Sequence, residues 1–113
     1  VIDMLALRDG LAYVVMNLRV GEAGKKELIL IDFENRTILS RSELPKDAIH
    51  PSLRKTPDGR IYGSTHTIFY QIEPGTTNIN VLVEGLNISV PGPVVGDMFY
   101  FATGHRLHAL KIP

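Results

Sequence analysis

A turn pair followed by an apolar stretch that contains tyrosine occurs three times in this chain. The copies are Asp9-Gly10-Leu11-Ala12-Tyr13, Asp58-Gly59-Arg60-Ile61-Tyr62 and Gly96-Asp97-Met98-Phe99-Tyr100, the last with its turn pair inverted. A second apolar stretch follows each copy and begins at Leu28, Phe69 or Leu107. Self-similarity at a period of about forty residues is typical of repeat architectures. The chain is therefore predicted to be built from stacked, similar units.

The first unit is longer than the other two between its tyrosine and its second apolar stretch. Fifteen residues separate Tyr13 from Leu28, whereas seven separate the matching residues of the later units. The extra residues fall within 17–26, where glycines and charged side chains are typical of a solvated hairpin loop. An insertion in a loop leaves the strands of a repeat intact.

Each unit is predicted to be one antiparallel sheet of short strands. Val, Ile, Tyr, Phe and Thr fill the apolar stretches, while Gly, Pro, Asn and Asp gather between them. The predicted strands are residues 3–7, 11–16, 27–33 and 36–42 in the first unit, 52–56, 60–65, 67–73 and 80–84 in the second, and 93–95, 98–102 and 106–112 in the third. Tyr13, Tyr62 and Tyr100 share one register and are predicted to pack between the sheets.

Four short strands in about forty residues is the content of one β-propeller blade. We therefore predict an all-β fold, a partial β-propeller of two to three four-stranded antiparallel blades in a single segment 1–113. Blade one covers about residues 1–44, blade two about 49–86, and an incomplete blade three about 90–113. A β-sandwich is the alternative fold. Because a closed propeller needs at least about four blades, we expect the remaining blades to come from a longer parent chain or from other copies of this one.

Several motifs in these units resemble those of the YVTN family of β-propellers. Residues 12–17, Leu30-Ile31-Asp32 and Pro57-Asp58-Gly59 are similar, in order, to the Tyr-Val-Thr-Asn strand, the Val-Ile-Asp strand and the Pro-Asp-Gly turn of that family. Ile61-Tyr62-Gly63-Ser64 leading into Ile72-Glu73-Pro74 is similar to quinoprotein-like blades, although the chain has no Trp for their docking motif. The resemblance implies blades and favours an extracytoplasmic or secreted location. It transfers no activity, because propellers serve both as binding scaffolds and as unrelated enzymes.

Charge and composition restrict the classes of partner and cofactor. The 113 residues include 12 basic and 12 acidic side chains, so the formal net charge is zero, whereas a nucleic-acid surface needs a basic excess. The lack of Cys excludes disulfides and thiol chemistry. No apolar run approaches the roughly twenty residues that span a bilayer, and phosphate-loop and dinucleotide fingerprints are missing. We predict no nucleic-acid partner, no membrane span and no cofactor.

The predicted binding residues lie on one face of the expected propeller. Loops between second and third strands and between successive blades open on that face, and they carry His50, His66, His105 and Arg106. Three converging imidazoles are able to bind a transition metal, but no His-x-His pair or neighbouring carboxylate gives metal-ligand spacing, so solvated histidines are favoured and no metal is predicted. Arg54 stands on an innermost strand, where it is able to attract an anion such as a uronate or carboxylate or simply to solvate the channel.

The sequence supplies no catalytic constellation. Gly-x-Ser-x-Gly is absent, and no Ser lies near a plausible base–acid pair. The predicted function is a non-catalytic propeller segment that provides a binding face for a protein or carbohydrate partner, with His50, Arg54, His66, His105 and Arg106 as ligand-binding residues. The alternative is part of a propeller enzyme, a lyase or hydrolase acting on a polysaccharide or lactone. A structural domain without a ligand is the third possibility.

Overall fold

The chain forms three antiparallel β-sheets in the computed structural model, which describes residues 2–17, 25–45 and 48–113. The first sheet contains β1 (Asp3–Ala6), β2 (Leu11–Asn17), β3 (Lys26–Asp32) and β4 (Thr37–Glu43). The second contains β5 (Ser52–Lys55), β6 (Ile61–Ser64), β7 (Phe69–Ile72) and β8 (Ile79–Val83). The third contains β9 (Val90–Val95), β10 (Met98–Thr103) and β11 (Arg106–Lys111). Neighbours in each sheet follow one another in the chain.

These strands confirm the all-β prediction. Within the described ranges, no helix is present and no sheet closes into a barrel. The observed strands fall on the predicted stretches, with the largest difference at β9, which begins at Val90 rather than at 93. Of the predicted loop 17–26, Asn17 ends β2 and Lys26 begins β3, and residues 18–24 lie outside the described residues.

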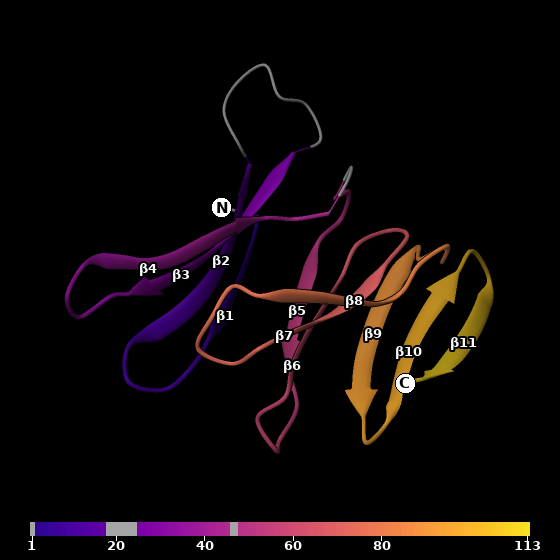
Figure 1. The fold of residues 1–113 in the computed structure, drawn as a ribbon. Helices are drawn as coiled ribbons and strands as arrows, with labels where there is room; N and C mark the ends of the chain where they lie inside the picture. The colour runs from indigo at the N-terminus through magenta and orange to yellow at the C-terminus, as the bar shows by residue number, and fades with distance from the viewer. Residues whose placement is uncertain (1, 18–24, 46–47) are drawn as a thin grey trace.

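The three sheets stand side by side in chain order, with the second between the other two (Figure 1). One apolar core joins the first and second sheets and includes Tyr13, Leu28 and Tyr70. Another joins the second and third sheets and includes Phe69 and Phe99. The second sheet is therefore buried on both faces.

Strand periodicity explains this double burial. Successive side chains of a strand point to opposite faces, so Ile61 belongs to the first core and Tyr62 to the second. All four residues of β6 are buried, as expected for a strand covered on both sides. Gly63 is required within it, because a Cβ there would lie 2.2 Å from Cζ of Tyr70.

The repeated turn pairs form the connections that the sequence predicted. Gly10, Gly59 and Gly96 lie in the turns before β2, β6 and β10 and have φ of 75°, 90° and 58°. Glycine adopts this left-handed backbone at little steric cost, which other residues rarely do. These turns lie at the end of the sheets opposite to the β6–β7 and β10–β11 loops.

The prediction for the third tyrosine is wrong. Tyr13 and Tyr62 are 0% and 2% exposed, as expected for residues between sheets, but Tyr100 is 41% exposed. The next sheet in the chain covers the faces on which Tyr13 and Tyr62 lie. Among the described residues no sheet covers the face of Tyr100.

Candidate functional site

Loops at one end of the three sheets are joined by hydrogen bonds into a continuous surface. The amide of His66 donates to the carbonyl of Ile49 at 3.0 Å, and the carbonyl of His66 accepts from the amide of Ile88 at 2.8 Å. The amide of Gly104 donates to Oγ of Ser89 at 3.0 Å. We call this surface the loop face and define it as residues 48–50, 65–67, 86–89 and 103–106.

The loop face contains four of the five residues predicted to bind a ligand. His50 is exposed and has a φ of 53°, and His105 and Arg106 are exposed at the β10–β11 turn. His66 is half-buried, and its Nδ1 atom is buried without a hydrogen-bond partner. Within residues 2–17, 25–45 and 48–113, no group of three His, Cys, Asp or Glu side chains is arranged to hold a metal ion. Their ligand-binding role stays a prediction.

Arg54, the fifth predicted residue, lies on β5 at the inner edge of the second sheet. Its Nη2 donates to Oγ of Ser52, two residues nearer the loop face. The guanidinium carbon lies 5.7 Å from the ring centroid of Phe99 in the third sheet, a distance typical of a cation–π contact. Its Nε is buried and has no hydrogen-bond partner. One donor of a half-buried cation therefore remains unsatisfied.

Asp3 is the carboxylate whose charge acts on the Arg54 guanidinium. Both of its oxygens accept hydrogen bonds from backbone amides. Oδ1 accepts from the amide of Met4 at 2.9 Å, and Oδ2 from the amide of Leu53 at 2.7 Å. The ion pairs found among the described residues do not include Arg54. Burial lowers the pKa of Arg54, and the charge of Asp3 partly opposes that shift. The guanidinium stays protonated, because arginine keeps its charge in proteins.

Ser64 adds a second unsatisfied group beside Arg54. It pairs with Ser52 in the β5–β6 register, and its Oγ is buried without a partner. Residues two apart on a strand share a face, so Ser64 and Tyr62 both face the third sheet. We call Ser52, Arg54, Ser64 and Phe99 the Arg54 site. Its unsatisfied groups are a guanidinium N–H and a hydroxyl, both buried, and a planar guanidinium matches the geometry of a carboxylate.

Tyr70 places one more unsatisfied hydroxyl on the opposite face of the second sheet. Its Oη is buried without a partner. Burial raises the pKa of Tyr70 far above its ordinary value, the charge of Asp3 adds to the shift, and Arg54 opposes it. The phenol therefore stays neutral and lies in the core between the first and second sheets, apart from the Arg54 site.

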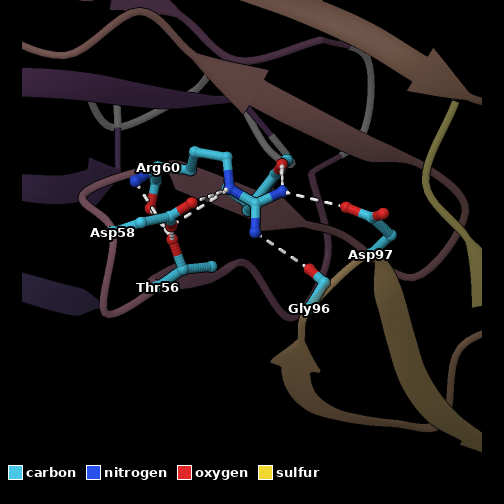
Figure 2. A network of polar contacts seen from close by, with 6 residues as sticks. Thr56, Asp58, Arg60, Gly96 and Asp97 are labelled. Carbon is cyan, nitrogen blue, oxygen red and sulfur yellow. Dashed lines mark hydrogen bonds and ion pairs between the residues drawn. The ribbon is translucent and has the colours of Figure 1, made fainter.

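A polar network at the turn end joins the second and third sheets (Figure 2). The Nη2 atom of Arg60 donates to the carbonyl of Gly96 at 2.9 Å, and its Nη1 atom lies 3.5 Å from Oδ1 of Asp97. Its Nε donates to Asp58 at 3.0 Å. The hydroxyl of Thr56 and then Arg60 lower the pKa of Asp58. All partners are protein groups, so we assign this network to the packing of the two sheets.

Arg60 was not among the residues predicted from the sequence, although its position in the repeat distinguishes it from its counterparts. Leu11 and Met98 stand at the matching position after the turn pair in the other units, and both are apolar. A cation at an otherwise apolar repeat position marks a special contact. Ser64 carries no such signal, since one hydroxyl in a strand looks the same whether or not a partner satisfies it.

A groove lies at the turn end between the first and second sheets, away from the loop face. Its volume is about 640 Å³. Its lining is of mixed charge and contains none of the five predicted binding residues: Leu7, Arg8, Asp9, Leu11, Lys55, Thr56, Pro57, Asp58, Gly59, Ile61, Pro74 and Gly75. Because opposite charges alternate along it, the groove favours no one sign of ligand.

No protein-family model, curated protein or solved structure matches the chain. The described residues contain no helix with the length and apolar character needed to cross a membrane.

Proposed function

We propose that the chain is a segment of a β-propeller and that its role is to bind a protein or carbohydrate partner through a carboxylate group. In this proposal the three sheets are consecutive blades, and the blades that complete the ring come from further sequence or from other copies. The observation that carries the ligand part is the half-buried Arg54, whose Nε has no partner and which makes no ion pair with Asp3 among the described residues.

The double burial of the second sheet supports blades over a sandwich. A β-sandwich encloses one core between two sheets, and here two cores lie on opposite faces of one sheet. Each sheet also keeps its strands in chain order, as propeller blades do.

A carboxylate ligand follows from the unsatisfied donors. A buried N–H without a partner costs free energy that a bound acceptor recovers, and a charge-assisted pair with a carboxylate is stronger than a neutral one. The hydrogen bond from Arg54 to Ser52 draws the guanidinium along β5 toward the loop face. A ligand that rests on the loop face is thus able to extend one carboxylate toward Arg54.

Calorimetric titration of the intact chain with galacturonate oligomers and with an acidic peptide tests this proposal. Loss of a hydrogen bond to a charged group costs about 1.5–3 kcal/mol, so Arg54→Gln is expected to weaken binding about tenfold or more. Arg36→Gln removes the same charge from the exposed β3–β4 turn and is the matched control. If neither probe binds the wild type, or if both variants bind equally well, the ligand proposal is wrong.

The same titrations address the enzyme alternative. A propeller lyase or hydrolase would shorten the galacturonate oligomers during incubation, and a binding module would leave them unchanged. Chromatography of the oligomers after incubation distinguishes the two functions, and shortening that disappears in His50→Ala or His66→Ala would favour the enzyme.

A further inference from the structure

The third sheet has an exposed apolar face on the side away from the second sheet. Phe99, Phe101 and Leu110 belong to the core shared with the second sheet, and the alternate positions of the same strands point away from it. The apolar residues at these positions form what we call the C-terminal end face, with Lys111 at its border beside Met98: Val90, Val95, Met98, Tyr100, Ala102, Leu107 and Ala109. Leu107 is 88% exposed, and Val90 is 61% exposed.

The outer side of the first sheet is apolar in part. Tyr13, Val15, Leu28 and Leu30 belong to the core shared with the second sheet. The apolar residues at the alternate positions, matched across the strands by register, form what we call the N-terminal end face: Met4, Ala12, Val14, Met16, Ile29, Ile31 and Ile38. The paired Glu27 and Arg41, with Glu43, share this side of the sheet, and Ala12, Val14 and Ile29 are themselves buried. Met4 and Ile38 are 51% and 49% exposed.

The repeat indicates what covers these two faces. Tyr13, Tyr62 and Tyr100 occupy the same position after their turn pairs. The second sheet covers the face of Tyr13, and the third covers the face of Tyr62. The face of Tyr100 is therefore the one on which a following sheet packs. The second and third sheets each use one face to contact the sheet that precedes them in the chain. The N-terminal end face is the matching face of the first sheet. The two end faces are the two sides of one kind of interface.

We propose that the C-terminal end face binds the N-terminal end face of a second copy of this chain, and that two copies close a ring of six sheets. This inference rests on the blade arrangement proposed above, but not on the carboxylate ligand. A head-to-tail interface forms a closed ring only when its rotation closes. Two chains of three sheets give six, within the range of about four to eight blades of most propellers, and three chains give nine, outside it.

The molar mass of the intact chain in solution tests the pairing. Light scattering during size exclusion is expected to give twice the 12.5 kDa of one chain. Leu107→Glu places a charge on the C-terminal end face at a fully accessible position and is expected to give the single-chain mass. Met4→Glu does the same on the N-terminal end face. Asn80→Glu, on the exposed edge strand β8 and outside both end faces, adds the same charge and should stay at twice the mass.

Mixing the two disrupted variants tests the head-to-tail geometry. The unaltered C-terminal end face of Met4→Glu is able to bind the unaltered N-terminal end face of Leu107→Glu, which restores one of the two joints. The mixture is therefore expected to contain paired chains that neither variant forms alone. Circular dichroism of each variant confirms that the sheets remain folded.

Three results overturn the inference. The first is a single-chain mass for the wild type at every concentration up to about 100 µM, well into the range where weak pairs form. The second is a mass that grows without limit, since an open stack does not close. The third is a pair that Met4→Glu leaves intact, because it would join two C-terminal end faces. None of these bears on the ligand titration, so the two proposals fail separately.

Discussion

Tyr13 shows how one residue joins two sheets. Its ring is fully buried, and its hydroxyl reaches the turn between β7 and β8 of the second sheet. There Oη donates to the carbonyl of Thr76 at 2.7 Å and accepts from the amide of Gly75 at 3.1 Å. The matching hydroxyl of Tyr62 accepts from Arg60 at 3.0 Å. The hydroxyl at this repeat position therefore contacts the neighbouring sheet in the first unit and a residue of its own sheet in the second.

Tyr13→Phe keeps the ring and removes the hydroxyl. Two backbone groups of the turn then lose a partner, which is expected to lower the free energy of unfolding by about 1–2 kcal/mol. Urea denaturation followed by circular dichroism measures the loss. Tyr100→Phe is the matched control, because that tyrosine is partly exposed and its hydroxyl makes no hydrogen bond within the described residues, and it should change stability by less than about 0.5 kcal/mol. Equal losses in the two variants would contradict the role of the hydroxyl.

The pKa of Tyr13 also predicts how the stability difference between the wild type and Tyr13→Phe changes at alkaline pH. Burial raises the pKa of Tyr13, its backbone hydrogen bonds with Gly75 and Thr76 oppose the shift, and the net change is upward. A raised pKa in the folded state means that folding favours the neutral phenol. The contribution of the neutral phenol to the free energy of unfolding is present below the unfolded-state pKa of about 10 and is lost as the pH rises above that pKa. The stability difference between the wild type and Tyr13→Phe should therefore narrow above about pH 10.

Stacked aromatic rings join the second and third sheets at the level of the elements. Phe69 stacks on Phe99 with ring centroids 4.3 Å apart, and Tyr62 and Phe101 extend the stack on either side. Phe99 is fully buried, and the cation of Arg54 lies over its ring. The third sheet thus depends on this core, whereas the first sheet depends on another.

Phe99→Ala is expected to cost about 3–5 kcal/mol, the usual loss for a large buried aromatic. Because Phe99 contacts only the core shared by the second and third sheets, amide hydrogen exchange should accelerate most in β9, β10 and β11 and least in β2 and β3. His108→Ala, on the same face but exposed and stacked on Phe101, is the control and should cost at most about 1.5 kcal/mol. Uniform acceleration across all three sheets would contradict two separate cores.

The sequence predicted the strands well because strand signals are local. An Asp-Gly pair before an apolar, β-branched stretch determines a turn and a strand from neighbouring residues alone. The packing between sheets depends on residues far apart in the chain. The hydrogen bond from Arg60 to Gly96 and the exposure of Tyr100 follow from which sheet covers which face, and the sequence pattern of a strand is the same whether its second face is covered or bare. The unsatisfied donors of Arg54 and Ser64 arise in the same way.

At the scale of the whole molecule, the described residues form a stack of three sheets whose middle sheet has a core on each of its two faces. Large exposed apolar patches on a protein surface mark interaction sites, and here the two patches lie at opposite ends of one stack. Each end face continues the pattern of an interface that already exists inside the chain. In the proposed ring both faces are buried at once, which links the stability of each sheet to the assembly.

This link predicts that the melting temperature of the wild type depends on chain concentration. When only the paired form is fully folded, each tenfold rise in concentration adds up to about 1.4 kcal/mol per pair, so Tm should rise between about 1 and about 100 µM. Leu107→Glu, which exists as single chains in the proposal, should melt at a lower Tm that does not change with concentration. Differential scanning calorimetry over this range measures both. A wild-type Tm that stays constant while the solution mass remains that of two chains would show that pairing leaves the sheets no more stable, and the end faces would then not be the surfaces that the ring buries.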